Sequence, residues 1–347
     1  MYRLLALLTL LVMLTSCTPT PTPIPPGPTP YTAPVTVAPA LPVQSALQAA
    51  QKGLPFYMVH TNRQHPVVHI MMAGFQQACA DLGLLCKDAG VDMEDIPGEI
   101  ANLERVVANG ASGILITVHD KAEYEMTKKA IDAGIPTVNG HFPMEDMVIP
   151  GMTAWVAPDN KAYAAAAAKA MAKKLDCKGT VAITQGGLND GENAVEASFR
   201  STLSAECPNI KILDTQIETF DQPAAIAVAS GILQANPDVV GAFSTTGNGP
   251  TTWAKGAQDV GKKPGEVTII SMDYSVQNLD LVKNGEVYML VGQPLYEEMY
   301  YAVYVLAAKM MGSPVPYANY LPAPLITKDN IDPYYEINEM AEGLTIQ

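Results

Sequence analysis

Short apolar runs alternate with longer segments of helical periodicity along most of this chain, and that alternation limits the possible folds more than any other feature. Residues 56–59 form the first apolar run, as expected of a strand buried on both faces. A polar stretch follows at 61–65, and from Pro66 apolar residues recur at helical spacing as far as Leu82. Strands and helices in alternation predict a parallel sheet covered by helices on both faces.

The alternation continues as far as residue 326. Further strands are predicted at 84–87, 113–118, 135–139, 155–156, 180–184, 210–217, 239–244, 267–272, 287–291 and 325–326. Further helices are predicted at 99–108, 122–132, 161–175, 192–204, 222–234, 251–260, 276–283 and 297–311. Two successive runs of such units predict an α/β protein of two similar lobes, with its functional site in the cleft between them.

The polar stretch at 61–65 follows the first predicted strand, at the edge where open α/β sheets bind ligands. It lacks the spaced glycines of a phosphate-binding turn, so it favours a small polar molecule over a nucleotide. The formal net charge is −14 and the chain has no basic run. This balance argues against a nucleic-acid partner and against a polybasic membrane-binding surface.

The N-terminus has the pattern of a secretion signal over residues 1–16. Arg3 precedes an apolar run at 4–14 that is too short to span a membrane as a mature helix. The run ends in Leu14-Thr15-Ser16-Cys17, which resembles the lipobox of bacterial lipoproteins. That resemblance implies cleavage before Cys17, lipidation of its thiol, and a protein exported and anchored to the outer face of the cell membrane or on its periplasmic side. The alternative is a plain signal peptide followed by a chance cysteine.

Residues 17–52 are predicted to be a tether between this anchor and a folded body. Residues 18–51 carry no charge and contain ten prolines, mostly in Thr-Pro repeats. Such a segment cannot build a core and is expected to stay extended.

Four cysteines remain, and disulfides are the default outside the cytoplasm. Cys79 lies near the end of the first predicted helix and Cys86 in the next strand, so a local bridge is expected. Cys177 and Cys207 each follow a helix and precede a strand, so they are expected to pair at one edge of a sheet. Four cysteines allow three pairings, and these spacings match no zinc site.

A series of short signatures resembles the type I periplasmic binding proteins of the ribose/galactose class, the receptors of sugar ABC importers. They are His65-Pro66 before Ala73-Gly74-Phe75, Ile114-Leu115-Ile116, Gly134-Ile135-Pro136, Ala157-Pro158-Asp159-Asn160, Asn236-Pro237-Asp238-Val239, Met272-Asp273, Lys283-Asn284-Gly285 and Gly292-Gln293-Pro294. Each signature is weak alone, whereas their order and spacing over residues 54–340 are specific.

The resemblance implies a two-lobed type I periplasmic-binding-protein fold, in which each lobe is a parallel sheet flanked by helices. Three hinge crossings would fall near Pro158, Pro294 and Pro322. The expected domains are lobe 1, made of 53–157 and 294–322, and lobe 2, made of 158–293 and 323–347.

Carried over residue by residue, the family's binding site matches this chain in part. Asp273 corresponds to an aspartate that accepts hydrogen bonds from ligand hydroxyls, although it could instead cap the helix at Val276. Gln293 matches a glutamine at the second hinge. Phe220 matches an aromatic residue that packs on a sugar ring, although it could instead be a core residue.

Elsewhere the chain departs from the ribose-type pattern. His65 replaces an asparagine, and Val67 and Val68 replace two phenylalanines; these departures put ribose itself in doubt. The remaining candidate ligand-binding positions of the chain are Thr61, His119, His141 and Phe142 in lobe 1, and Asn193, Thr246 and Asn248 in lobe 2.

All five histidines fall in the first lobe, and four of them, His60, His65, His119 and His141, lie at or just beyond the carboxyl ends of strands. Three interpretations remain open. The imidazoles could bind a polar ligand in their neutral form, they could be structural, or they could hold a metal, although no carboxylate or thiolate is spaced with them. We favour the first, and expect no metal and no cofactor.

The expected function is that of a monomeric, lipid-anchored, non-enzymatic receptor that delivers a sugar, polyol or related compound to an ABC permease. A receptor for a signalling furanose of the autoinducer-2 type is the alternative within binding proteins. A tethered hydrolase using Asp190, Glu192 and Asp273 is the alternative from another class, although no Gly-x-Ser-x-Gly motif or metal triad is present.

Overall fold

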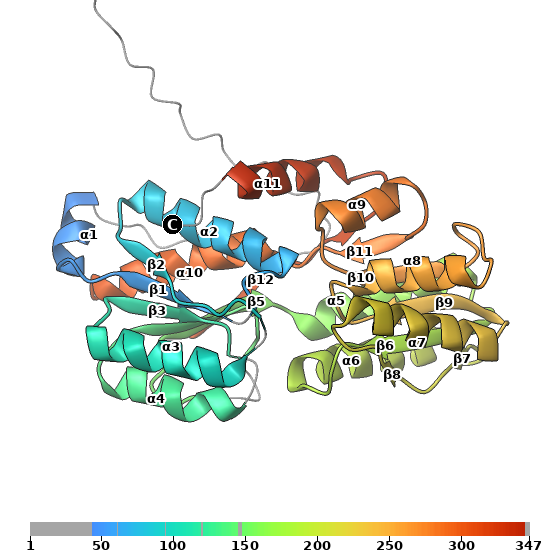
Figure 1. The fold of residues 1–347 in the computed structure, drawn as a ribbon, viewed down its shortest axis with the longest axis horizontal. Helices are drawn as coiled ribbons and strands as arrows, with labels where there is room; N and C mark the ends of the chain where they lie inside the picture. Colours follow the sequence, from blue (N-terminus) through green and yellow to red (C-terminus); the bar gives the residue numbers. More distant parts are fainter. Residues whose placement is uncertain (1–43, 61, 94, 119–120, 145–147, 344–347) are drawn as a thin grey trace, which may run out of the picture.

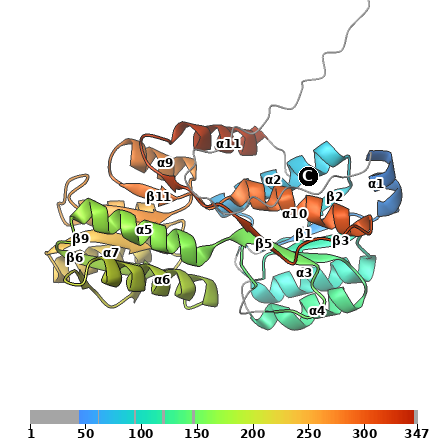
Figure 2. The same cartoon turned by 180° about the vertical axis from the view of Figure 1, so that it is seen from behind.

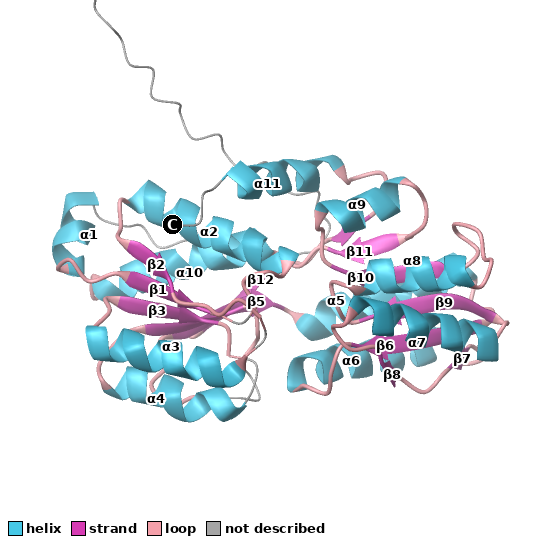
Figure 3. Ribbon diagram, in the orientation of Figure 1, coloured by secondary structure: helices cyan, strands magenta, loops and turns pink. Residues whose placement is uncertain are grey.

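The computed structural model describes residues 44–60, 62–93, 95–118, 121–144 and 148–343. It contains two separate sheets, each with helices on both faces (Figures 1 and 3). The predicted signal peptide, Cys17, most of the tether, Thr61 and His119 lie outside the described residues.

The sheet of lobe 1 is parallel throughout, in the order β12-β5-β4-β3-β1-β2. Its strands are β1 (Phe56–Val59), β2 (Cys86–Asp88), β3 (Gly113–Ile116), β4 (Thr137–Gly140), β5 (Ala154–Pro158) and β12 (Ala318–Leu321). The helices of this lobe are α1 (Gln44–Gln51), α2 (Pro66–Leu82), α3 (Ile96–Asn109), the 3₁₀ turn η1 (Lys121–Glu123), α4 (Tyr124–Asp132) and α10 (Leu295–Met310).

Alternate residues of the lobe 1 strands pack against different helices. Ile114 and Ile116 belong to the same core cluster as residues of α3 and α4, whereas Leu115 between them packs with α2 and α10. This is the arrangement that an uninterrupted apolar strand requires, because both of its faces must be covered. The helices lie on opposite sides of the sheet (Figure 1).

Lobe 2 repeats this plan with a sheet in the order β13-β11-β10-β9-β6-β7, and β8 also pairs with β6. All its pairs are parallel except that of β13 with β11. The strands are β6 (Thr180–Gln185), β7 (Lys211–Ile212), β8 (Gln216–Ile217), β9 (Val239–Ser244), β10 (Thr268–Met272), β11 (Met289–Val291) and β13 (Leu325–Ile326). The helices are α5 (Asn160–Leu175), α6 (Asp190–Glu206), α7 (Gln222–Ala235), α8 (Gly249–Asp259), α9 (Val276–Lys283) and, at the end of the described chain, α11 (Asp332–Gly343).

The chain passes between the two sheets three times: after β5, between β11 and α10, and between β12 and β13 (Figure 2). The three passages lie side by side. Leu321 pairs with Pro158 at the end of β5, and the Gly292 N–H donates to the Pro324 carbonyl at 2.7 Å.

Each predicted strand has a counterpart within two residues, except that 210–217 forms two strands, β7 and β8. The interruption has a local cause, because the Arg200 guanidinium donates to the Leu213 carbonyl and to Thr215 Oγ1. The prediction missed β12, α1 and α11. Pro316 and Pro322 flank β12, so the segment appeared in the sequence to be a proline-rich crossing.

The expectation of an extended tether as far as residue 51 is wrong for its last eight residues, which form α1. Leu47 is 1% exposed, and the Gln51 side chain donates to the Leu85 carbonyl and accepts from the Leu85 N–H. Ala and Gln are good helix formers, and one buried leucine fixes this short helix on lobe 1.

Helix α11 contacts α2 of lobe 1 as well as α9 of lobe 2. Its polar contacts are with lobe 2: Asn338 Nδ2 donates to the Tyr274 carbonyl at 2.7 Å, and the Tyr335 hydroxyl donates to Asp280 Oδ1 at 2.7 Å. Residues 323–347 are predicted for lobe 2 alone, so the contact of α11 with α2 links the lobes in addition to the three passages.

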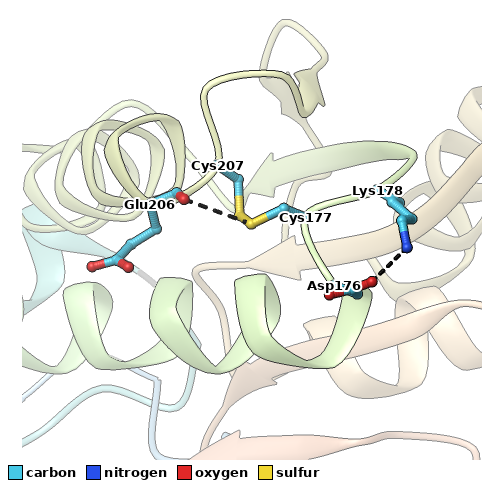
Figure 4. The surroundings of a disulfide bond; sticks show 5 residues. All are labelled: Asp176, Cys177, Lys178, Glu206 and Cys207. Atoms are coloured by element: carbon cyan, nitrogen blue, oxygen red, sulfur yellow. Dashed lines mark hydrogen bonds and ion pairs between the residues drawn. A yellow bond between two sulfur atoms is a disulfide. The ribbon is translucent and has the colours of Figure 1, made fainter.

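Both predicted disulfides are present, Cys79–Cys86 and Cys177–Cys207. The second joins the turn after α5 to the end of α6, and Cys177 Sγ lies 3.6 Å from the Glu206 carbonyl oxygen (Figure 4). It closes a loop of 30 residues at the end of lobe 2 that is remote from the strand carboxyl ends.

Candidate functional site

A cavity of about 190 Å³ lies between the carboxyl ends of the strands of the two lobes. Both lobes contribute to its wall, as do the first turn of α5 and Gln293, which belong to two of the three passages between the sheets. The described lining residues are His60, Asn62, His65, Val67, Val68, Met71, Thr117, His141, Phe142, Asn160, Tyr163, Asn189, Gly191, Glu192, Val195, Phe220, Thr245, Thr246, Gly247, Asp273 and Gln293.

Most of the predicted site residues that the structure describes come together here. They are His65, His141, Phe142, Phe220, Thr246, Asp273 and Gln293. Asn193 and Asn248 are not among the lining residues. Asn193 is exposed on α6, one position beyond Glu192, and successive helical residues point about 100° apart. Asn248 stands at the N-terminus of α8 and is half-buried.

The prediction missed Asn160, Tyr163 and Glu192 as lining residues. Asn160 and Tyr163 occupy the first turn of α5, directly after the first passage between the lobes. The side chain of Asp159 caps this helix by accepting from the Ala162 N–H at 2.9 Å. A helix that starts at a passage between the lobes must present its first turn to the cleft, which is the signal that could have identified both residues.

The loop between β1 and α2 is held by an ionic network. Asp88 Oδ1 lies 3.0 Å from His60 Nε2, and Arg63 Nε donates to Asp88 Oδ2 at 2.6 Å. Burial tends to raise the pKa of Asp88, but the hydrogen bonds from His60 and Arg63 outweigh it and leave the pKa well below its usual range. The network orders a loop in which Asn62 adopts a left-handed conformation, φ +57°, beside the cavity.

His65 is the N-cap of α2, because its Nδ1 accepts from the Val67 N–H at 3.3 Å. Burial lowers its pKa, and the nearby His141 and His69 lower it further. A nitrogen that accepts a backbone hydrogen bond must be unprotonated, so both observations agree with the predicted neutral imidazole at this position.

His141 follows β4 in a left-handed conformation, φ +72°, which is uncommon for a residue with a side chain. Its Nδ1 lies 2.7 Å from Oε1 of Glu298, a fully buried residue in the first turn of α10. Burial opposes a charge on His141, but Glu298, and to a smaller extent Asp273, raise its pKa overall. The contact with Glu298 therefore shifts His141 toward its charged form, whereas the predicted imidazole is neutral.

Asp273 follows β10 in the same way and with a similar backbone, φ +67°. It is 5% exposed, and its Oδ1 has no hydrogen-bond partner among the described residues. Burial raises its pKa to about 7, although the charge on His141 opposes this rise. The alternative role as a helix cap is wrong, because Ser275 caps α9 by accepting from the Asn278 N–H.

Two other lobe 2 carboxylates, Glu192 and Glu218, accept hydrogen bonds from the protein, although Glu218 Oε2 has no partner among the described residues. Glu192 accepts from the Gly186 N–H, the Thr245 hydroxyl and the Asn189 amide, at 2.6 to 3.0 Å. The Thr246 hydroxyl donates to Glu218 and accepts from the Gly249 N–H, so its hydrogen-bonding capacity is largely used. Of the three carboxylates considered for hydrolysis, Glu192 is thus committed to holding its own loop.

Aromatic side chains come from both lobes. Phe142 packs edge-on against the His141 ring, with centroids 4.7 Å apart. A Cβ atom on Gly191 of lobe 2 would lie 3.5 Å from Phe142 Cδ1 of lobe 1, so the lobes approach each other at this side of the cavity. Phe220 of lobe 2 is 43% exposed and therefore is not a core residue.

Among the described residues, no three His, Cys, Asp or Glu side chains are grouped as a metal site would require. Within that same part of the chain, no helix has the length and apolar character needed to cross a membrane.

The cavity lies between two α/β lobes, and comparison with known proteins agrees with this architecture. The family model for the periplasmic binding protein domain matches residues 56–314. The chain belongs to the type I periplasmic binding proteins. The resemblance noted in the sequence is therefore confirmed.

Three known proteins are similar to this chain. A D-ribose/D-allose-binding protein of Pseudomonas aeruginosa is 26% identical over 219 residues, which are 61% of this chain and 67% of that protein. A D-apiose import binding protein of Paraburkholderia graminis is 25% identical over 207 residues, 58% of this chain and 64% of that protein. The solved sugar-binding protein of a sugar ABC transporter from Bacillus halodurans is 26% identical, with a TM-score of 0.74, and the alignment covers 81% of this chain and 100% of that one.

Replacing Asp273 by asparagine is expected to stabilise the empty protein at alkaline pH. Because the folded-state pKa of about 7 exceeds the ordinary 3.8, the folded state binds more protons, and stability falls as pH rises from about 4 to 7. An asparagine at this position cannot ionise and tolerates the left-handed backbone. The stability gain of Asp273→Asn over wild type should therefore grow by at most about 4 kcal/mol between pH 4 and pH 8.

Urea unfolding at both pH values measures this difference. Asp329→Asn, at an exposed aspartate of lobe 2, is the matched control and should show no such growth. If Asp273→Asn stabilises the protein equally at pH 4 and pH 8, the raised pKa of the buried Asp273 carboxyl is contradicted.

Proposed function

We propose that this protein captures one uncharged sugar or polyol between its two lobes and presents it to an ABC importer. The observation that carries the proposal is that Oδ1 of the buried Asp273, a residue lining the cavity between the lobes, has no hydrogen-bond partner among the described residues. A buried carboxylate without a partner is costly, and a ligand hydroxyl that donates to it removes that cost. The sugars named for the relatives supply such hydroxyls.

The electrostatics of the wall favour an uncharged ligand. The described lining residues include no lysine or arginine, and they include the carboxyl groups of Asp273 and Glu192. A phosphate or a sugar acid would lack the guanidinium or ammonium partner that such anions normally have in proteins, and a positive charge on His141 is already paired with Glu298. The faces of Phe142 and Phe220, one from each lobe, can cover the apolar face of a sugar ring.

Closure follows from where the contacts lie. Because groups from both lobes touch the same small molecule, the ligand favours the conformation in which the lobes are close together. We propose that the three adjacent passages near Pro158, Pro294 and Pro322 are the hinge, and that the permease recognises the closed form. No residue needs to carry out chemistry on the ligand.

We also propose that the chain is exported and held at the membrane through lipid on Cys17, with the proline-rich segment as a tether. The lipobox-like Leu14-Thr15-Ser16-Cys17 supports this. Cells expressing the full chain should incorporate labelled palmitate into the wild type and not into Cys17→Ser. Equal labelling of the two proteins would contradict anchoring at this residue.

Calorimetric titration of the purified protein tests the proposed ligand class. D-ribose, D-allose, D-apiose and xylitol form the uncharged panel, and D-ribose 5-phosphate is the charged counterpart of D-ribose. We expect at least one uncharged compound to bind with 1:1 stoichiometry and to be recovered unchanged, and the phosphate not to bind. Binding of none of the panel, or turnover of a bound sugar, would contradict the proposal.

A pair of glycine variants tests the role of Asp273 without altering its carboxyl group. A Cβ on Gly247 would lie 2.4 Å from Asp273 Oδ2, so Gly247→Ala must displace the carboxylate. Loss of a charged hydrogen bond predicts binding weaker by roughly tenfold or more. Gly187→Ala, where a Cβ meets nothing within 4 Å, is the control and should bind as the wild type does.

A further inference from the structure

The contact between His141 and Glu298 joins a residue of the cavity wall to the first turn of α10, which follows the second passage between the lobes. Glu298 is wholly buried in the first turn of α10, four residues after Pro294 at the second passage. Its Oε2 has no hydrogen-bond partner among the described residues, and its Oε1 lies 2.7 Å from His141 Nδ1. Burial raises the pKa of Glu298 and His141 opposes that rise, so a positive charge on His141 stabilises the ionised carboxylate.

The position of His141 is fixed by the backbone as well as by this contact. Its N–H donates to the Val156 carbonyl of the neighbouring strand at 2.9 Å, and its left-handed φ turns the side chain away from the direction that a continued strand would give. The Phe142 ring packs against the imidazole. With Nδ1 directed to Glu298, Nε2 is the ring nitrogen available to a molecule in the cavity that His141 lines.

We propose that Glu298 is a positioning residue of the binding site, which holds His141 as an oriented imidazolium whose Nε2–H is donated to an oxygen of the ligand. The proposal rests on the proposed function for the class of ligand, and it adds which hydrogen-bonding groups the ligand must have. An imidazolium can donate and cannot accept, whereas the Asp273 carboxylate on the other lobe can accept. The ligand must therefore offer an acceptor oxygen to lobe 1 and a hydroxyl donor to lobe 2, and an ammonium group facing His141 is rejected.

Titratable groups from three elements surround the imidazole. Glu298 faces it from α10, Asp273 from the end of β10, and His65 from the loop before α2. The two carboxyl groups raise the pKa of His141, which places its loss of charge above the ordinary value of 6.5. The contribution of His141 to binding should therefore fall as the pH rises through that raised pKa.

Histidine side-chain NMR on the ¹⁵N-labelled, ligand-free protein tests the charge state without any sugar. We expect both ring nitrogens of His141 to be protonated at pH 7. In Glu298→Gln the midpoint of the His141 titration should fall by at least about one pH unit, a tenfold loss of proton affinity. His141→Gln assigns the signal, and Glu297→Gln, on the same helical turn, is the control in which the midpoint stays near that of the wild type.

A neutral His141 at pH 7, or the same midpoint in Glu298→Gln and in wild type, would overturn the proposal. The NMR result does not depend on the sugar panel. Failure of the proposed function can therefore be distinguished from failure of the proposed role of Glu298.

The panel sugar that binds the wild type most tightly provides a second readout. At pH 8 we expect Glu298→Gln to bind it about tenfold or more weakly than wild type, and at pH 5, where both proteins carry the charge, the ratio of the two Kd values should approach one. A purely structural role for Glu298 would give the same ratio at both pH values.

Discussion

Two strands at corresponding places in the two sheets end in residues with left-handed backbones, and the cavity depends on this constraint. β4 and β10 are each the third strand of their sheet, and they are followed by His141 and Asp273. Such conformations cost of order 1–3 kcal/mol each and persist only where the surroundings impose them. The strands are packed on both faces, which supplies that support. The fold therefore holds a donor and an acceptor at facing sheet edges, where a small molecule can join the lobes.

The proposed binding site contains buried charged groups whose hydrogen bonds are incomplete. Asp273 and Glu298 are both buried, and each has an oxygen without a hydrogen-bond partner among the described residues. Both carboxyl groups act on His141, because each of them raises its pKa. A neutral cavity would make the empty protein more stable, so the arrangement makes sense where a ligand supplies the missing hydrogen bonds. The same residues that would bind the ligand therefore lower the stability of the empty protein.

Much of the fold could be predicted from the sequence, since apolar runs such as 56–59 and 239–244 specify buried strands directly. Helix α1 and strand β12 could not, because their short, weakly patterned segments fold only against neighbours that are distant in sequence. In the site, Asp273 and Gln293 were identified from the family pattern. Glu298 was not, because it contacts His141 across 157 residues of sequence, and no local pattern encodes the charge state that results.

The central claim is that His141 and Asp273 hold one ligand between the lobes. A crystal structure of the protein with the tightest-binding uncharged sugar tests it most directly. The account predicts a single sugar in the cavity between the lobes, with a hydroxyl within hydrogen-bond distance of Asp273 Oδ1 and a ring or hydroxyl oxygen within hydrogen-bond distance of His141 Nε2. A sugar bound outside this cavity, or bound inside it without contact to either residue, would contradict the account.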